Sequence, residues 1–450
     1  MKRYEAYKNC NIPWIKQIPS HWMTKRAKFL YKKEQRPVRE EDSVVTCFRD
    51  GVVTLRKNRR TTGFTEAISE FGYQGIRKGD LVIHVMDAFA GAIGVSDSDG
   101  KGTPVYNVCT AYGDSNNYYY AYALREMARA GFIQSLYRGI RERSSDFRFD
   151  VFERQYLPVP PREEQDQIVR YLDWQVSKIN RLIAAKRKQI ALLREQIQQT
   201  ITDVVYHGVD QTVNYQPVKM LYVDKIPEHW KCKRGKFLFA EHDIRSTDGK
   251  EELLSVSHIT GVTPRSQKNI TMFKAESLVN YKICRKNDIA ANTMWMWQGA
   301  IAVSSYHGVI SPSYNTYHQI DNAYDSAYLD YMLRSKPLVD EYYVRSTGIR
   351  KSRLRLYPEQ LLDMFFPVPP VEEQKRIAAV IAEKTQAAND FIAAIEKQIE
   401  KINEFRVRMI SDVVTGQIDV RGIKVPDNEY INNEITEEEF EEESENNEEE

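Results

Sequence analysis

Two stretches of the chain carry apolar residues at alternating steps of three and four positions, the spacing that lines one face of an α-helix. They lie within residues 158–210 and 367–420. Each is about 45 residues long, or roughly 65–70 Å of helix, and its stripe would face water unless another helix covered it. The predicted seam residues are Ile179, Ile183, Ile190, Leu193, Ile197, Ile201 and Val204 in the first stretch, and Ile392, Ile395, Ile399, Ile402, Ile410 and Val413 in the second.

Each stretch opens with prolines that favour a helix start. The segment Pro158-Val-Pro160-Pro161 cannot continue a helix, but a proline at the first helical position loses no hydrogen bond that the helix needs. Glu163 and Glu164 then fall in the first turn, where the positive end of the helix dipole favours carboxylates. Both helices are therefore predicted to begin at a proline segment.

The chain contains two divergent copies of one segment order. IPSHWMTKRAKFL at 18–30 and IPEHWKCKRGKFL at 226–238 are identical at nine of thirteen positions, at an offset of 208. The helix openers LPVPPREEQ and FPVPPVEEQ match at an offset of 209, as do the helix ends TDVVYHGVD and SDVVTGQID. A period this long indicates a duplicated domain, because solenoid repeats are only about 20 to 50 residues long.

Each copy combines a globular segment with the long helix that follows it. Short apolar runs bounded by Gly, Asn and Asp, such as 79–86 and 299–306, are typical of strands and turns, whereas 120–137 has helical spacing. We therefore predict duplicated α/β (mixed α+β) domains. The predicted boundaries are a first domain at 1–157, a central helix at 158–210, a second domain at 211–366, a C-terminal helix at 367–420 and an acidic tail at 421–450.

The two helices most simply cover each other's apolar stripes. If the duplicated halves are related by a pseudo-twofold axis, the helices must form an antiparallel coiled coil. The alternative is that each helix lies along its own domain. Such a helix would outreach a domain of about 150 residues, which is roughly 30 Å across.

The formal net charge of +1 conceals an uneven distribution of charge. Residues 427–450 hold thirteen acidic and no basic residues, so the other 426 residues hold 64 basic against 50 acidic ones. A body of net charge +14 favours a polyanionic partner, although scattered surface lysines would give the same total.

The five cysteines lie far apart and form no CxxC pair, which favours a reducing compartment and disfavours a zinc ribbon. The first ten residues, MKRYEAYKNC, lack the apolar core of a signal peptide. No window approaches the roughly 18 apolar residues of a membrane span. We therefore expect a cytoplasmic protein with no membrane partner and no metal site.

Basic segments flanked by aromatic residues recur in both copies. They are LRKNRRTTGF (55–64), YRGIRERSSDFRF (137–149) and its counterpart RSTGIRKSRLRLY (345–357). Such clusters suit DNA, because neutralised phosphates release counterions and arginine can read guanine; a solvated charged loop is the alternative for each. The candidate DNA-binding residues are Arg56, Lys57, Asn58, Arg59, Arg60, Arg138, Arg141, Arg143, Arg345, Arg350, Lys351, Arg353 and Arg355.

Catalytic motifs are missing from the sequence. It has no Walker A loop, no GxGxxG after a strand, no HExxH and no DPPY or NPPF tetrapeptide. Glu373-Gln-Lys375 has the ExK spacing of many nucleases, but it lies in a first helical turn without an upstream Pro-Asp, so a solvated helix face is expected. His21 and His229 recur inside HW pairs, where a packing or capping contact is expected.

This set of repeated segments resembles the specificity subunit of type I restriction-modification systems, over residues 1 to about 420. The resemblance rests on WIKQIPSHW and its echo KIPEHW, on LPVPPREEQ and FPVPPVEEQ, and on the helix ends TDVV and SDVV. It implies that 1–157 and 211–366 are target recognition domains that read a bipartite site on double-stranded DNA. The helices 158–210 and 367–420 would be the spacer between these domains.

The resemblance also implies partners and cofactors. Two modification subunits would bring S-adenosylmethionine, dock partly on the spacer helices and methylate adenine N6, and restriction subunits that use ATP and Mg²⁺ can join them. The chain itself is then expected to bind no cofactor and to be no enzyme. The acidic run at 436–450 is outside the shared pattern, and it either solvates a disordered tail or competes with DNA for the basic surface.

Two other functions remain open at this point. One is a DNA methyltransferase or nuclease with an unrecognised active site, which the missing motifs disfavour. The other is a purely structural coiled-coil adaptor, which does not explain why each helix accompanies a large, basic and divergent domain.

Overall fold

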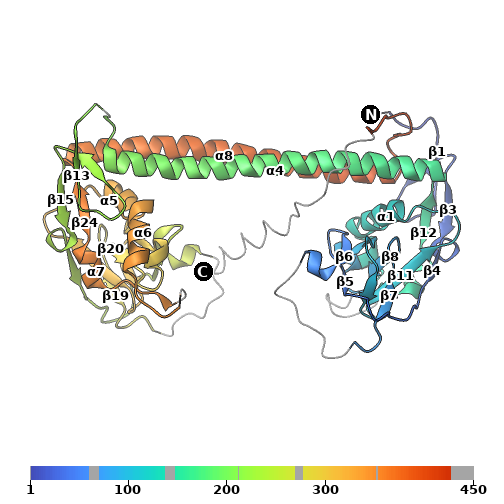
Figure 1. Ribbon diagram of the computed structural model, residues 1–450, viewed down its shortest axis with the longest axis horizontal. Helices are drawn as coiled ribbons and strands as arrows, with labels where there is room; N and C mark the ends of the chain where they lie inside the picture. The colour runs from blue at the N-terminus through green and yellow to red at the C-terminus, as the bar shows by residue number, and fades with distance from the viewer. Residues whose placement is uncertain are drawn as a thin grey trace. The chain divides into compact units, whose positions relative to one another are not determined.

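The computed structural model describes residues 2–59, 70–136, 147–210, 212–268, 277–350 and 353–426 (Figure 1). The chain divides into two compact units: unit 1 comprises Met1–Lys186 and Lys397–Glu450, and unit 2 comprises Arg187–Glu396. Each of the two long helices, α4 (Arg162–His207) and α8 (Val371–Val414), belongs partly to unit 1 and partly to unit 2.

A four-stranded antiparallel sheet lies at the centre of unit 1. Its strand order is β4 (Tyr31–Lys33), β11 (Tyr106–Ala111), β8 (Leu81–His84) and β9 (Ile93–Val95). Side chains alternate along β8, as strand geometry requires: Leu81 and Ile83 are buried in the main core with helix α1 (Asn117–Arg129), whereas Val82 is buried in a second cluster on the other face. Both faces of the sheet are therefore covered.

Unit 2 contains the same sheet. Its order is β16 (Phe239–His242), β23 (Asn315–Gln319), β20 (Ile289–Ala291) and β21 (Ile301–Val303). The register is retained as well, because Leu81 pairs with Val95 and Ile289 pairs with Val303, each shifted by 208. The two copies in the sequence therefore share one strand order.

Short ladders and helices complete each unit. In unit 1, the paired strands are β1 (Tyr7–Asn9) with β2 (Gln17–Pro19), β3 (Met23–Arg26) with β12 (Tyr156–Val159), β5 (Val45–Cys47) with β6 (Val53–Leu55), and β7 (Gln74–Ile76) with β10 (Gly100–Gly102). Its 3₁₀ turns are η1 (Ala27–Phe29), η2 (Arg56–Asn58) and η3 (Ala88–Ala90). Its short helices besides α1 are α2 (Phe132–Ser135) and α3 (Phe149–Phe152). In unit 2, the paired strands are β13 (Tyr215–Pro217) with β14 (Lys225–Pro227), β15 (Lys231–Arg234) with β24 (Phe365–Val368), β17 (Leu254–Ser257) with β18 (Gly261–Pro264), and β19 (Lys282–Cys284) with β22 (Gly308–Ile310). Its 3₁₀ turns are η4 (Gly235–Phe237), η5 (Arg265–Gln267) and η6 (Met296–Gln298). Its short helices are α5 (Ser326–Leu333), α6 (Lys336–Arg345) and α7 (Pro358–Asp363).

Local sequence explains where the short helices begin and end. The Asn116 side chain caps α1 by accepting hydrogen bonds from the amides of Tyr118 and Tyr119, which a helix cannot satisfy internally. The expected single helix over 120–137 is wrong in one respect. Gly131, with φ of 72°, separates α1 from α2, because glycine adopts this left-handed conformation without steric cost.

The long helices begin slightly later than expected. Pro158 lies in β12, which pairs with β3, so the proline segment first ends a strand and α4 starts at Arg162, after Pro161. Glu163 and Glu164 occupy the first turn of α4. In unit 2, β24 precedes α8 in the same way.

Within each unit, the start of one long helix packs with the end of the other. In unit 1, Ile179 and Ile183 share a core with Val413; in unit 2, Val204 shares a core with Ile381. The pairing is therefore antiparallel in both units, and α4 and α8 lie side by side in Figure 1. The predicted fold class, two mixed α/β domains with two long helices packed together, is confirmed.

Each globular domain holds the end of the helix that follows the other domain. The Tyr119 hydroxyl donates a hydrogen bond to the Val414 carbonyl oxygen at 3.1 Å, and the equivalent Tyr328 hydroxyl donates to the Val205 carbonyl oxygen at 3.0 Å. These bonds satisfy carbonyl groups that a helix end leaves unpaired. The alternative in which each helix lies only along its own domain describes neither unit.

Among the helices of the described residues, none combines the length and the apolar character that crossing a bilayer requires.

Candidate nucleic-acid interface

The repeated HW pair anchors the start of each long helix. In unit 1, the Trp22 indole Nε1 donates to Glu164 Oε1 at 3.0 Å, and His21 Nε2 lies 2.8 Å from Glu164 Oε2. The Tyr4 hydroxyl donates to the same carboxylate. The pKa of Tyr4 lies far above its usual value because burial and the adjacent Glu164 charge both disfavour a phenolate, which keeps Tyr4 a donor.

Unit 2 repeats this anchor. Trp230 Nε1 donates to Glu373 Oε2 at 3.1 Å, and His229 Nε2 lies 2.8 Å from the same oxygen. Lys375, the other charged residue of the ExK segment, instead contacts Glu372 at 2.7 Å. The Glu373 carboxylate therefore helps to fix a helix start, which is the kind of capping contact expected for the HW pairs.

The glutamine of the EEQ segments links each long helix to its globular domain. Gln165 accepts a hydrogen bond from the amide of Asn116, the residue that caps α1, at 2.9 Å. Gln374 accepts from the amide of Asp325, which caps α5, at 2.7 Å. Both side-chain amides also donate to a proline carbonyl just before the helix. The repeated motifs are thus framework residues of each unit.

The first basic cluster lies on η2, and much of it is engaged by the domain itself. The Arg59 guanidinium lies 2.9 Å from Asp50 and stacks over the Phe48 ring at 4.5 Å. Arg56 Nε donates to Thr46 Oγ1 at 3.3 Å, and Asn58 Nδ2 donates to Thr54 Oγ1 at 2.9 Å. Lys57 is exposed.

The basic segment of unit 2 projects beyond the end of α6. Arg345 is held by Glu341 at 2.8 Å. Further along, Thr347 and Arg355 form an antiparallel backbone bridge with hydrogen bonds of 2.9 and 3.0 Å. The side chains of the remaining described candidates face solvent; they are Arg350, Arg353 and Arg355.

Some predicted positions lie outside the described residues. They are Arg60, Arg138, Arg141, Arg143, Lys351 and the acidic residues 427–450.

An aromatic surface beside the basic segment of unit 2 was not predicted from the sequence. Trp295 and Trp297 stack with ring centroids 5.8 Å apart, and Trp297 lies 6.1 Å from Tyr343. They come from the loop between β20 and β21 and from α6. Both indoles are partly buried. The unusual run MWMW was the available signal, but sequence does not tell how far a tryptophan is buried.

The predicted seam residues lie along the paired helices. Those that are buried are Ile179, Ile183, Ile190, Val204, Ile392, Ile395 and Val413. Those that are partly buried are Leu193, Ile197, Ile201, Ile399, Ile402 and Ile410. Met409 is also buried and was not predicted. The polar interruption at Lys186 is accommodated by a hydrogen bond from its Nζ to Gln398 Oε1 at 2.6 Å.

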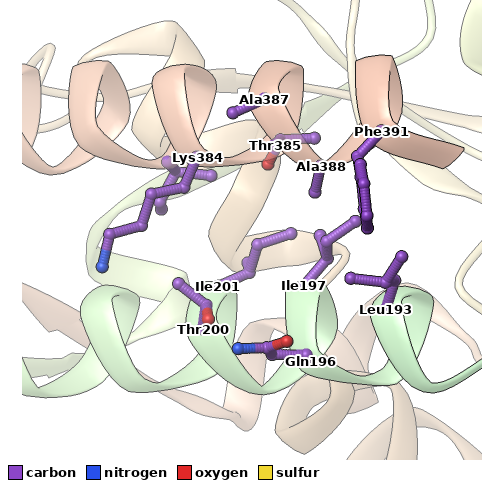
Figure 2. A pocket seen from close by; sticks show the side chains of 11 residues that line it. Leu193, Gln196, Ile197, Thr200, Ile201, Lys384, Thr385, Ala387, Ala388 and Phe391 are labelled. Carbon is purple, nitrogen blue, oxygen red and sulfur yellow. The ribbon is translucent and has the colours of Figure 1, made fainter. Parts of the chain in front are cut away.

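The helix pair of unit 2 contains a cavity of about 420 Å³. Figure 2 shows Leu193, Ile197 and Ile201 of α4 facing the small side chain of Ala388 and the ring of Phe391 on α8. At the equivalent positions of unit 1, Ile179 replaces Ala388 and Met409 replaces Thr200, and both are buried. Small residues at seam positions therefore leave this cavity.

The described residues contain no group of three or more His, Cys, Asp or Glu side chains that could hold a metal ion. All five cysteines are free. Burial raises the pKa of Cys232 to about 11 and that of Cys284 to about 12, so both remain thiols near neutral pH.

The chain is similar to two curated proteins of Methanocaldococcus jannaschii. It is 23% identical over 321 residues to the putative type I restriction enzyme MjaX specificity subunit, and this alignment covers 68% of each chain. It is 25% identical over 206 residues to the type I restriction enzyme MjaVIII specificity subunit, and this alignment covers 42% of this chain and 43% of the relative. No protein-family model matches the chain.

The fold is also similar to that of a solved chain from a study of complex assembly and conformational transition in the type I restriction-modification system. The superposition has a TM-score of 0.59 at 15% identity and covers 89% of this chain and 99% of that one. Two mixed α/β domains with paired long helices thus define the class of protein. In sequence the chain is similar to specificity subunits of type I restriction enzymes, and in fold it is similar to a chain of the type I restriction-modification system.

Proposed function

We propose that this DNA target-recognition subunit of a type I restriction-modification complex reads a bipartite site on double-stranded DNA. The first target recognition domain is 1–157 and the second is 211–366. The spacer helices are 158–210 and 367–420, and 421–450 is an acidic tail.

The observation that carries this proposal is a shared framework with different exposed loops. Both units have the same strand order, the same Trp–Glu anchor and the same tyrosine bond to a helix end. The framework can therefore present both domains to DNA in the same manner. The exposed loops differ in sequence, so each domain can select its own half-site.

The basic segments supply the affinity for DNA in this proposal. Exposed Lys57 in unit 1 and Arg350, Arg353 and Arg355 in unit 2 are suited to phosphate contacts, which release counterions and make binding depend strongly on salt. Two linked modules raise the effective concentration of the second contact and lengthen the sequence that is read. Long paired helices are stiff, so they would hold the number of unread base pairs constant.

Two modification subunits are the proposed protein partners, docked partly on the spacer helices. They would bring S-adenosylmethionine and methylate adenine N6 in the half-sites. Restriction subunits that use ATP and Mg²⁺ are the further proposed partners. The chain itself belongs to a non-catalytic family, and it binds no cofactor in this proposal.

The role of Glu373 supports this division of labour over the alternative of a DNA methyltransferase or nuclease with an unrecognised site. Its carboxylate contacts Trp230 and His229 at the start of a helix, so the ExK segment serves as a helix anchor. Incubating the purified chain with DNA, S-adenosylmethionine and Mg²⁺ separates the two functions. Methyl transfer or cleavage by the chain alone would favour the alternative.

Mapping of methylated adenines tests the main proposal. The chain is co-expressed with its modification subunit in a host without adenine methylation, and the genomic DNA is sequenced with a method that detects N6-methyladenine. We expect methylation within a two-part motif separated by a constant number of unspecified base pairs. A continuous motif, or methylation that is independent of the chain, would contradict the proposal.

A further inference from the structure

Two hairpin loops have the same backbone in the two units. They are residues 85–92, between β8 and β9, and residues 292–300, between β20 and β21. The amide of Ala92 donates to the Asp87 carbonyl at 3.2 Å, and the equivalent amide of Ala300 donates to the Trp295 carbonyl at 3.1 Å. Gly91 and Gly299 end the 3₁₀ turns with the same φ of 94°, which only glycine adopts readily.

The inward-facing residues of these loops serve packing, whereas the other positions differ in chemistry. Ala88 and Met296 are buried at equivalent positions. Asp87, which pairs with the exposed Arg49 at 3.1 Å, stands where unit 2 has Trp295. Phe89 likewise stands where unit 2 has Trp297. One scaffold thus presents a charged pair in unit 1 and an aromatic pair in unit 2.

The aromatic loop of unit 2 belongs to a surface that is costly to expose to water. Met294 is 37% exposed and is next to Trp295 in the chain, and Tyr343, which lies against Trp297, is 47% exposed. Val344, which follows Tyr343, is 57% exposed, whereas the two stacked indoles are partly buried. Trp297 Nε1 donates to the Met294 carbonyl at 3.0 Å, which fixes the ring orientation. Exposed apolar side chains beside aromatic rings are typical of a binding site on a globular protein.

The same loop lies beside exposed arginines. The amide of Leu356, at the end of the basic segment, donates to the Thr293 carbonyl at 3.3 Å, and in unit 1 the equivalent amide of Phe147 donates to the Val85 carbonyl at 3.1 Å. Each hairpin loop is therefore attached to the basic segment of its own unit. In unit 2 this places Arg355, held by the backbone bridge to Thr347, on the segment next to the indoles.

We propose that loop 292–300 is the base-reading element of unit 2, with Trp295 and Trp297 as its specificity-determining residues. Indole rings can discriminate bases by apolar contact with thymine methyl groups, while neighbouring arginines contact phosphates. Loop 85–92 holds the equivalent place in unit 1 and reads with the charged pair Arg49 and Asp87, which suit guanine and cytosine edges. This inference rests on the proposed function and assigns its specificity to particular side chains.

Base preference at a single half-site is the test. Trp295→Ala, Trp297→Ala and the conservative Trp297→Phe are each assembled in full length with the modification subunit, and the methylated motif is mapped as for the unchanged chain. We expect discrimination between the preferred and other bases to fall by about 10-fold in one half-site, with the other half-site and the gap unchanged. Phe237→Ala, which removes another exposed aromatic of unit 2 outside this loop, is the matched control and should leave the motif unchanged.

Three outcomes would overturn the inference. They are an unchanged motif in all three variants, an equal loss of discrimination in both half-sites, or the same change in Phe237→Ala. If the alanine variants fail to assemble, the Trp297→Phe complex is tested in binding competition among duplexes that are altered in one half-site only. Affinity ratios equal to those of the wild-type complex for every duplex would overturn the inference. Failure of the proposed function is distinguishable, because the unchanged chain would then show no two-part motif.

Discussion

Trp22 donates its indole Nε1–H to Glu164 Oε1 at 3.0 Å, and this bond helps to tie the globular domain of unit 1 to the first turn of α4. The Glu164 side chain is almost fully buried and accepts from three donors. A negative charge in the first turn is favoured by the helix dipole, and the donors replace the water that the carboxylate loses. The HW and EEQ segments are therefore two sides of one contact.

Glu164→Gln should lower the free energy of unfolding of unit 1 by about 1–3 kcal/mol, because one acceptor oxygen becomes a donor facing other donors. Glu373→Gln is the matched change in unit 2, where the carboxylate has two of these donors and is more exposed, so a smaller loss is expected. Urea unfolding followed by tryptophan fluorescence measures both. An equal or larger effect of Glu373→Gln would contradict the assigned roles.

Filling the cavity of unit 2 should stabilise the helix pair. Ala388→Ile introduces the residue that unit 1 has at this position, into a cavity of about 420 Å³. We expect a gain of about 0.5–2 kcal/mol in the free energy of unfolding, measured by urea unfolding. Ile179→Ala, the reverse change in unit 1, should cost about 2–5 kcal/mol. A destabilised Ala388→Ile would show that the helices cannot accept the side chain.

Acidification should loosen loop 85–92. The pKa of His84 lies below its usual value because burial disfavours the imidazolium, and Arg49 adds repulsion while Asp87 opposes both. His84 Nδ1 accepts the amide hydrogen of Asp87 at 3.1 Å, and its ring faces Tyr106. The folded state therefore binds its proton less readily than the unfolded state, whose histidine has a pKa of about 6.5.

The sign follows from this difference in proton binding. The contribution of neutral His84 to the free energy of unfolding is fully present above about pH 6.5 and decreases as the pH falls below it. The decrease is at most about 1.4 kcal/mol per pH unit for one proton. Hydrogen exchange of residues 84–92 at pH 7.5 and 5.5, corrected for intrinsic rates, measures the loosening. His84→Asn keeps a hydrogen-bond acceptor but removes the titratable imidazole, so it should reduce the pH dependence of hydrogen exchange in the loop. An unchanged pH dependence would show that other groups cause it.

Leu182 on α4 and Phe391 on α8 are equivalent residues, and both are about half exposed. If the modification subunits dock on the spacer helices, each should cover one of these side chains. We predict that Leu182→Glu removes one modification subunit and that Phe391→Glu removes the other, because a buried unpaired charge is strongly unfavourable. Mass photometry counts the subunits. Two bound subunits in the double variant would exclude these positions from the interface.

Much of the architecture was predictable because the duplicated segments are framework contacts. Trp22 and Glu164 form the same bond in unit 1 as Trp230 and Glu373 form in unit 2, so both copies have these residue types. The helix stripe was equally visible, since burial of Ile183 and Ile392 requires an apolar residue at a fixed spacing. These features depend on local pattern and on repetition, and both can be read from one sequence.

Other features depend on tertiary contacts that the sequence does not record. The cavity beside Ala388 arises where a small residue occupies a seam position, and a stripe of larger apolar residues did not reveal it. The hydrogen bond between the Leu356 amide and the Thr293 carbonyl, which attaches the basic segment to the aromatic loop, could not be foreseen, because a long segment separates these residues in the chain. Arg59 is a candidate DNA-binding residue, and its contacts with Asp50 and Phe48 could not be inferred from a basic run.

A paired deletion in the spacer helices tests most directly whether they set the gap between two recognition domains. Residues 187–193 of α4 and 396–402 of α8 are one heptad each. Lys186 and Arg194 border the first heptad and contact Gln398 and Glu396 within the second, and deleting both heptads keeps the spacing of the remaining seam residues. Seven residues of helix are about 10.5 Å long, or roughly 3 base pairs of DNA. We predict that mapped N6-methyladenine moves to a two-part motif with the same half-sites and a gap shorter by about 3 base pairs. Methylation at the original gap by the shortened chain would contradict the account.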